Sequence, residues 1–273
     1  MFDPLELPAW QENKFKKVKE INLPVIDFGF IHCDSTYDAI STRNGKFVYL
    51  DAHLDRFYAG CSSLRINMPY DRSTLKTLMN NLLKISPIEN PLVFIVITRG
   101  IAQNGARDLI TPKPNFFMFL RPCKPWPNNN TVSVCISSVI RNDSIDQTIK
   151  NFSWNDLTMA QFEAIDRGYD TAILLSRDKF VTEGPAFNIG IIKNNSVYAP
   201  AKVRLGGITM KRVEDFCNYN LIPFEYTDID VNELLSADAV FLTSTGANIV
   251  TVSKLENVEY EPHFILNRLR EEV

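Results

Sequence analysis

The sequence predicts an α+β chain of two domains, and three observations carry that prediction. The length of 273 residues suits one large or two modest domains. Apolar residues make up 45% and charged residues 22% of the chain, which is ordinary for a globular protein and excludes disordered, collagen-like and heptad-repeat classes. Segments with helical periodicity and segments with strand periodicity also follow one another along the chain.

Residues 1–120 are expected to form a small N-terminal α+β domain. Apolar residues recur at spacings of three and four in two stretches, which predicts two amphipathic helices. The residues that carry these two patterns are Leu54, Phe57 and Cys61, and then Leu75, Leu78 and Leu82. The predicted elements are, in order, a turn at Gly45, a strand at 47–51, helices over 53–66 and 72–85, and strands at 91–100 and 115–123.

A linker is expected over residues 121–130, because RPCKPWPNNN concentrates proline and asparagine. The larger C-terminal domain then covers 131–273. Asn194 and Asn195 lie where a hairpin turn needs positive φ. The predicted elements of this half are a strand at 131–140, a helix over 155–168 with an Asn or Asp cap, strands at 171–176 and 180–184, a hairpin over 187–200, a helix over 209–219, a strand, a helix over 231–237, two strands around 242–248 and a terminal helix.

Composition excludes several partners. The chain has 29 Lys plus Arg against 32 Asp plus Glu, a formal charge of −3, and no basic run, so nucleic acid is not expected. The apolar run at 92–97 is far shorter than the roughly 20 residues of a membrane helix. No apolar stretch follows a basic start, and five cysteines without a C-x-x-C pair suggest reduced thiols, so a cytoplasmic location is expected. Three histidines without ligand spacing predict no metal site.

Two titratable residues are candidates for chemistry. Lys150 precedes NFSWNDL, where aromatic neighbours that exclude water can make its amine a nucleophile toward a carbonyl. Glu183 closes the run FVTEG at a glycine, where a strand end can aim a carboxylate inward. A solvated surface lysine and a turn glutamate are the alternatives.

Three further segments suit an anion. In LGGITM two glycines lead into a predicted helix, so the backbone N–H groups of Ile208 and Thr209 are presented at the positive end of a helix dipole. LTSTGAN offers hydroxyls, Thr245 among them, followed by Gly246 and Ala247. Arg56 in HLDRF lies off the apolar stripe of its helix and can reach solvent or a phosphate. A capped helix and an ordinary β-turn are the alternatives for the first two segments.

Together these residues supply what a pyridoxal 5'-phosphate (PLP) enzyme requires. PLP needs a Schiff-base lysine, an acidic partner for its pyridine nitrogen and a site for its phosphate dianion. A lysine, a carboxylate and two anion sites meet those needs.

The order of these segments resembles the class IV aminotransferases, the fold type IV PLP enzymes. The resemblance covers nearly the whole chain. It rests on five ordered blocks, namely GFIHCDSTYDAI through HLDRFYAG to NMP, KNFSWNDL with FEAIDRG, VTEGPAFN, LGGIT and TSTGAN.

The resemblance implies a small N-terminal α/β domain and a larger C-terminal pseudo-barrel domain. It implies that Lys150 carries the Schiff base and that Glu183 partners the pyridine nitrogen. The phosphate is then bound by Arg56, by the backbone of Ile208 and Thr209, and by Thr245.

On the substrate side, the family places a tyrosine where Tyr37 lies. The resemblance adds Trp154, the arginine Arg107 for a substrate carboxylate, and the turn at Gly246 and Ala247. A solvated loop arginine is the alternative for Arg107.

The chain also departs from the family pattern in three places. Phe94 stands where amine-active relatives tend to have an acidic residue, which counts against pure amine specificity. Met210 stands where an arginine is common. Pro185 and Ala186 replace small hydroxyl residues or glycine.

The expected function is a transaminase that moves an amino group from a branched-chain or D-type amino acid, or from an (R)-amine, to a keto acid. The family also implies a homodimer with a shared active site. Two alternatives remain open: a PLP lyase of the aminodeoxychorismate type, and a non-catalytic dimeric binding module on the same fold.

Overall fold

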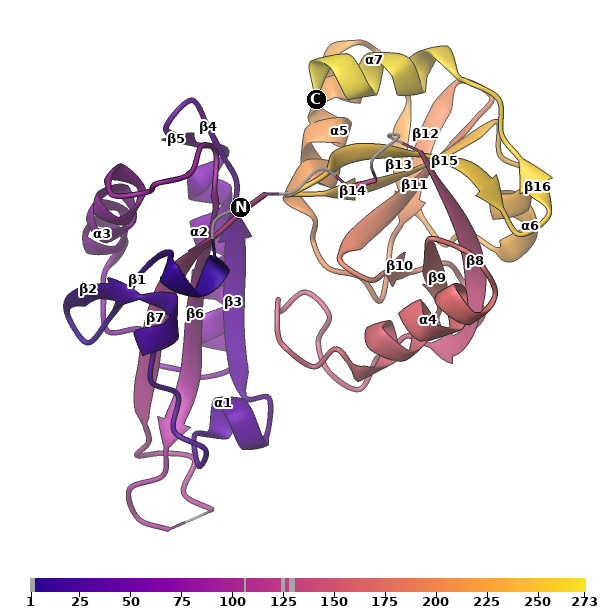
Figure 1. Ribbon diagram of the computed structural model, residues 1–273. Helices are drawn as coiled ribbons and strands as arrows, with labels where there is room; N and C mark the ends of the chain where they lie inside the picture. Colours follow the sequence, from indigo (N-terminus) through magenta and orange to yellow (C-terminus); the bar gives the residue numbers. More distant parts are fainter. Residues whose placement is uncertain (1–2, 106, 124–125, 128–130) are drawn as a thin grey trace. The chain divides into compact units, whose positions relative to one another are not determined.

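The computed structural model describes residues 3–105, 107–123, 126–127 and 131–273. Its contacts divide the chain into two compact units (Figure 1). The first unit is Met1–Lys124 with Ile149–Ser153, and the second is Pro125–Thr148 with Trp154–Val273. Of the linker expected at 121–130, residues 124, 125 and 128–130 lie outside the described part of the chain.

The first unit is built on a five-stranded antiparallel sheet in the order β2-β1-β7-β6-β3. Its strands are β1 (Pro8–Gln11), β2 (Lys14–Lys17), β3 (Ser35–Ile40), β6 (Leu92–Ile101) and β7 (Lys113–Arg121). The other elements are the short pair β4 (Thr42–Arg43) and β5 (Lys46–Phe47), the helices α1 (Phe28–Ile31), α2 (Leu50–Ser63) and α3 (Arg72–Lys84), and the 3-10 turns η1 (Pro4–Glu6) and η2 (Val18–Glu20).

Helices α2 and α3 cover one face of this sheet and form its core. Leu54 and Phe57 of α2 and Met79 of α3 are buried against alternate residues of β6 and β7, as the two helical patterns predict. Leu50, however, already begins α2, and Tyr49 before it has φ 51°. The predicted strand at 47–51 is therefore wrong, because the pairing ends at Phe47 and the backbone turns at Tyr49.

The second unit is built on a nine-stranded sheet whose main path is β13-β12-β11-β14-β15-β8-β9. Its strands are β8 (Thr131–Ile140), β9 (Thr171–Leu175), β10 (Glu183–Gly184), β11 (Phe187–Lys193), β12 (Ser196–Pro200), β13 (Phe224–Thr227), β14 (Ala239–Ser244), β15 (Asn248–Leu255) and β16 (Val258–Glu259). Its helices are α4 (Asn155–Asp166), α5 (Ile208–Tyr219), α6 (Val231–Leu235) and α7 (Phe264–Glu272).

Alternation along β14 divides its side chains between two of the apolar clusters of the second unit. In β14, Val240 and Leu242 belong to one apolar cluster. Phe241, between them, belongs to the cluster that α5 and α7 cover. Gly190 of the neighbouring strand is required here, since a Cβ would lie 2.3 Å from the Phe241 ring.

The hairpin predicted at 187–200 is confirmed, with φ 51° at Asn194 and 59° at Asn195. Two details of this half differ from the prediction. Helix α4 begins at Asn155 as predicted, but no side chain caps it. In the run 180–184 only Glu183–Gly184 is a strand. None of the helices in the described part of the chain combines the length and hydropathy that a membrane crossing requires.

Candidate functional site

Lys150 lies in the short segment that returns to the first unit, and β3 holds it by its backbone. Its carbonyl oxygen accepts hydrogen bonds from the Tyr37 N–H at 3.0 Å and from the Thr36 hydroxyl at 2.9 Å. Its amine lies 4.8 Å from the centre of the Tyr37 ring. The structure therefore brings together two residues that the sequence proposed for the same site.

Tyr37 is part of a row of aromatic rings on the face of the first sheet that α2 does not cover. It stacks on Phe152 at 4.2 Å and faces Phe94 at 6.1 Å between ring centres. Phe94 in turn stacks on Phe119 at 5.1 Å. The amine of Lys150 is thus next to an extended apolar surface.

Arg56 lies on α2 and is held by a carboxylate of β3. Its Nε and Nη2 donate to the two oxygens of Asp38 at 2.9 and 2.8 Å, and His53 Nδ1 is 2.8 Å from Asp38 Oδ1. Burial raises the pKa of Asp38, but the charge of Arg56 and the hydrogen bond with His53 outweigh burial and hold that pKa well below its usual range. Asp38 is therefore an ionised partner that fixes the plane of the Arg56 guanidinium.

Glu183 is buried at the start of the β10–β11 hairpin, in the second unit. Its Oε1 accepts a hydrogen bond from Arg141 Nε at 3.0 Å. Its Oε2 accepts hydrogen bonds from Asn188 Nδ2 at 3.2 Å and from the Leu205 N–H at 2.9 Å. A buried carboxylate held by these three donors is able to form a charge-assisted hydrogen bond with the protonated nitrogen of an aromatic ring.

The segment before α5 is tied to this carboxylate. Asn188 Nδ2 also donates to the Leu205 carbonyl at 2.9 Å, and a Cβ at Gly207 would lie 1.9 Å from Asn188 Oδ1. Gly207 is the N-cap of α5, and no side chain caps this helix. The N–H groups of its first turn, from Ile208 and Thr209, have no intrahelical acceptor, so they are suited to a phosphate.

The turn 245–247 joins β14 to β15 and continues this site. Ser244 Oγ accepts a hydrogen bond from the Ala247 N–H at 3.0 Å, and Asn248 Oδ1 accepts one from Arg212 Nη1 of α5 at 3.0 Å. The turn that contains Thr245 and Gly246 is thus connected to the helix whose first turn is the other anion candidate.

Thr243 adds an observation that the sequence did not single out. The residue is 2% exposed, and within the described part of the chain its hydroxyl has no hydrogen-bond partner. Thr243 pairs with Asn188 in register, and alternation puts it on the same face as Phe241, toward α5. A buried unsatisfied hydroxyl costs stability, and a bound phosphate is a natural acceptor for it.

Arg107 and Trp154 are the two remaining substrate residues expected from sequence. Arg107 is exposed in the connection between β6 and β7. Trp154 precedes α4 and packs on the apolar cluster beneath that helix in the second unit.

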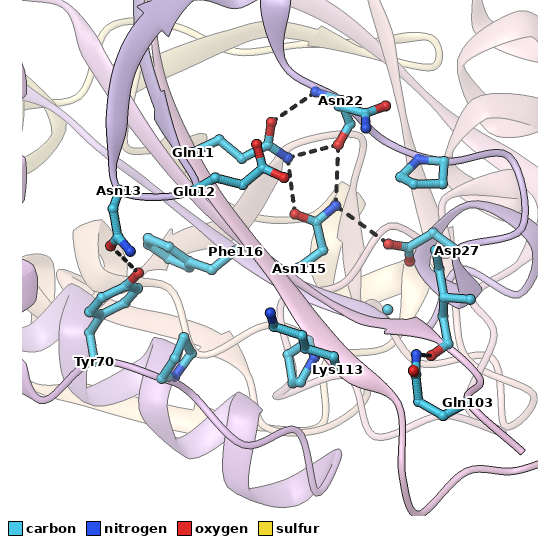
Figure 2. A pocket seen from close by; sticks show the side chains of 15 residues that line it. Gln11, Glu12, Asn13, Asn22, Asp27, Tyr70, Gln103, Lys113, Asn115 and Phe116 are labelled. Atoms are coloured by element: carbon cyan, nitrogen blue, oxygen red, sulfur yellow. Dashed lines mark hydrogen bonds between the residues drawn. The ribbon is translucent and has the colours of Figure 1, made fainter.

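A cavity of about 630 Å³ lies elsewhere in the first unit, around the base of the β6–β7 connection (Figure 2). Several polar side chains around it are hydrogen-bonded to neighbouring groups of the protein. Gln11 Nε2 donates to the Asn22 carbonyl at 2.7 Å and to Asn115 Oδ1 at 3.0 Å, and Thr98 donates to Asp27 at 2.9 Å. These bonds fasten the segment around residues 22–29 to the sheet, and none of the proposed site residues lines the cavity.

Three site neighbours were missed from sequence. Asp38 holds Arg56, His53 holds Asp38, and Arg141 holds Glu183. A signal for Asp38 existed, because a charged residue interrupts an otherwise uncharged strand next to Tyr37. No local pattern marked Arg141, which only the fold brings to Glu183.

Comparison with known proteins decides the family. The model of the amino-transferase class IV family matches residues 35–255. The chain belongs to the class IV aminotransferases. The predicted family and the transaminase class of activity are thereby confirmed, and enzymes of this family act with PLP, so the expected cofactor is confirmed as well.

Individual relatives of this class IV aminotransferase are distant in sequence and close in fold. A protein of Methanocaldococcus jannaschii assigned as a branched-chain-amino-acid aminotransferase is 27% identical over 92% of this chain and 88% of its own length. The D-alanine aminotransferase of Bacillus licheniformis is 29% identical over 87% and 84%. The crystal structure of the branched-chain aminotransferase of Thermoproteus uzoniensis, 21% identical, matches with a TM-score of 0.91 over 97% of this chain and 92% of that one. The fold type IV architecture is confirmed.

The residues present fit PLP. In the second unit these are a buried carboxylate, a helix N-terminus that no side chain caps, and the Thr243 hydroxyl, which has no partner among the described residues. The first unit offers a lysine amine against an aromatic ring and a guanidinium fixed by Asp38.

Proposed function

We propose that Lys150 is the catalytic lysine of this aminotransferase, that Glu183 holds the pyridine nitrogen of PLP, and that Arg56, Ile208, Thr209 and Thr245 hold its phosphate. The observation that carries this proposal is the Lys150 amine 4.8 Å from the Tyr37 ring, on a backbone that β3 anchors. PLP, when bound, supplies an aldehyde carbon and an aromatic ring that accepts the electron pair released at the substrate Cα.

The side chains of this chain then divide the work. The Lys150 amine would act as the general base that removes the proton from the substrate Cα, and as the general acid that delivers a proton later in the reaction. Its backbone, anchored on β3, would keep that amine over the Tyr37 ring. Glu183 would stabilise a proton on the ring nitrogen of PLP, and the aromatic surface around Tyr37 would exclude water.

The donor is proposed to carry an apolar side chain. Tyr37, Phe94, Phe119 and Phe152 form a continuous apolar surface beside the amine. A substrate side chain that lies on this surface gains by burial of apolar area. Branched-chain amino acids, apolar D-amino acids and (R)-amines all meet this requirement, with a keto acid as acceptor. Arg107 and the turn at Gly246 and Ala247 are proposed to bind the substrate carboxylate, and Trp154 to border the substrate.

A homodimer in the cytoplasm is also proposed. Four apolar side chains in and before α1 are exposed, namely Val25 at 73%, Ile26 at 58%, Phe30 at 62% and Ile31 at 49%. A cluster of this kind is typical of a protein contact surface, and a second copy of this chain is the partner that the family suggests. The five cysteines include no disulfide among the described residues, as is usual in a reducing compartment.

A half-reaction assay tests the proposal. Purified protein loaded with PLP should change its cofactor absorbance when an apolar amino donor is added, and it should form a new amino acid only when a keto acid acceptor is present. The Lys150→Ala variant should lose both signals. The Lys202→Ala variant, which removes an exposed lysine paired with Asp228, should keep them.

The same assay separates the lyase. Release of pyruvate from an aminodeoxychorismate-type substrate without any keto acid acceptor would replace the transaminase assignment. Full activity of Lys150→Ala would remove Lys150 from the mechanism. A wild-type protein that takes up no added PLP would favour the non-catalytic alternative.

A further inference from the structure

Arg141 is buried at the end of β8 and is bonded through all three of its guanidinium nitrogens. The residue is 6% exposed. Its Nε donates to Glu183 Oε1 at 3.0 Å, its Nη1 donates to Asp156 Oδ2 at 2.5 Å, and its Nη2 donates to Gln147 Oε1. These acceptors come from β10, from the first turn of α4 and from the loop that follows β8. The guanidinium plane is therefore fixed from three directions.

The acceptors are themselves held. Gln147 Nε2 donates to the Ile145 carbonyl at 3.1 Å and to the Asn142 carbonyl. Asp156 Oδ2 also accepts the Asn142 N–H at 2.8 Å. Arg141 is thus part of a rigid polar network and not a flexible side chain that happens to lie near Glu183.

The other oxygen of Glu183 is fixed independently. Asn188 and the Leu205 N–H both donate to Oε2. With Arg141 on Oε1, the carboxylate has a defined orientation. A carboxylate with a side chain only 7% exposed also needs a positive partner, because burial of a lone charge is costly. Arg141 supplies that partner by a charge-assisted hydrogen bond.

We propose that Arg141 is a positioning residue: it keeps Glu183 ionised and aimed, and in this way sets the affinity of the chain for PLP. This inference rests on the proposed role of Glu183. Arg141 acts through that carboxylate and need not touch the cofactor. Lysine is a poor substitute, because a single ammonium cannot serve three acceptors in one plane.

The test measures PLP binding to the cofactor-free protein by equilibrium titration, so its readout does not depend on catalysis. Arg141→Gln should raise the dissociation constant for PLP about tenfold or more. The free energy of a hydrogen bond to a charged group corresponds to a factor of about this size. Arg141→Lys should restore part of the affinity. Arg177→Gln is the matched control, because it removes an exposed arginine paired with Asp143 in the same unit, and it should leave the dissociation constant unchanged.

A double-mutant cycle distinguishes action through Glu183 from a general effect on the fold. In a Glu183→Gln background the Arg141→Gln change should have little further effect on PLP affinity. Additive losses would overturn the proposal, because Arg141 would then act independently of Glu183. Wild-type affinity in Arg141→Gln would also overturn it.

The remaining outcomes separate this inference from the proposed function. If the Glu183→Gln variant binds PLP with wild-type affinity, the proposed role of Glu183 itself is refuted. If Arg141→Gln fails to fold by circular dichroism, Arg141→Lys decides. A folded Lys variant with several-fold weaker PLP binding supports the proposal, and one with unchanged binding overturns it.

Discussion

Asp38 receives two hydrogen bonds from the Arg56 guanidinium, at 2.9 Å from Nε and 2.8 Å from Nη2, and the carboxylate is completely buried. This pair joins β3 to α2 beside Tyr37. It connects the stability of the first unit to the placement of a proposed phosphate ligand, and it leads to the first prediction.

Asp38→Asn should destabilise the protein by about 3 to 5 kcal/mol at pH 7, because one partner of a buried ion pair is removed. The pKa of Asp38 is depressed in the folded state, so its contribution is complete above the ordinary aspartate pKa of about 4 and is lost as the pH falls below that value. Urea unfolding of both proteins at pH 7, 5 and 3 measures this difference.

The matched control for this change is Asp55→Asn, which alters an exposed carboxylate on α2, the helix of Arg56; Asp55 pairs with Arg72. Its effect should be much smaller at every pH. A difference between Asp38→Asn and wild type that persists undiminished at pH 3 would contradict the ion-pair explanation.

Thr243→Val should stabilise the cofactor-free protein slightly and weaken PLP binding. The change removes a buried hydroxyl that has no hydrogen-bond partner among the described residues, which relieves a cost of about 1 kcal/mol or more. The same hydroxyl is proposed to reach the phosphate, so its loss should raise the PLP dissociation constant. Thermal unfolding with and without PLP measures both effects, and unchanged PLP affinity would exclude Thr243 from the phosphate site.

Ala186→Gly should stabilise the protein by about 1 kcal/mol. Ala186 has φ 69° in the two-residue turn between β10 and β11, a region that costs a residue with a Cβ about 1–2 kcal/mol. Greater freedom of glycine in the unfolded chain offsets part of this gain. Ala201→Gly is the control, because Ala201 is exposed and its φ is not positive. This change should be destabilising. Urea unfolding decides, and a loss of stability in Ala186→Gly would refute the strain.

Phe94→Ala should reduce kcat/KM for phenylalanine by about tenfold and change the value for alanine much less. The lost ring lies between Tyr37 and Phe119 on the proposed donor surface, and apolar contacts of this size are worth about 1–3 kcal/mol in specificity. Tyr219→Ala, which removes an aromatic ring that is 89% exposed, is the control. Equal losses for both donors would argue that Phe94 supports the sheet and does not contact the side chain of the donor.

Phe30→Glu should convert the proposed dimer to a monomer. A charge in the exposed apolar cluster of residues 25–31 opposes its burial against a second copy. Sedimentation velocity of wild type and variant measures the mass. Leu221→Glu, at a position 91% exposed in the second unit, should leave the mass unchanged, and a wild-type protein that sediments as a monomer would end the dimer proposal.

The elements predicted from sequence were those with a strong local signal. The helix over 72–85 is found at Arg72–Lys84, and the strand over 131–140 is found at the same residues, because apolar spacing marked both. Strands β1 and β2 were missed, since they are only 4 residues each and the exposed β2 is largely lysine. The strand predicted at 47–51 is wrong. FVYLD is apolar enough for a strand, and no residue pattern in it indicates the left-handed backbone conformation of Tyr49.

The residues of the proposed site also differ in how strongly the local sequence marks them. Lys150, Glu183 and the glycines before Ile208 lie in contiguous motifs, so they were accessible from sequence. Their supports were not, because Arg141 meets Glu183 across 42 residues of chain and Thr36 meets Lys150 across 114. Contacts of this length depend on strand pairing that no local window contains.

The bonds from β3 to the Lys150 carbonyl have a consequence for dissecting the chain. The first unit is discontinuous, since it includes Ile149–Ser153 from far downstream. A fragment that ends at residue 124 would retain the sheet but leave the Tyr37 N–H and the Thr36 hydroxyl without the acceptor they have in the whole protein. The two halves are therefore poor candidates for separate expression or for exchange with a relative's half, unless the 149–153 peptide is supplied together with the first unit.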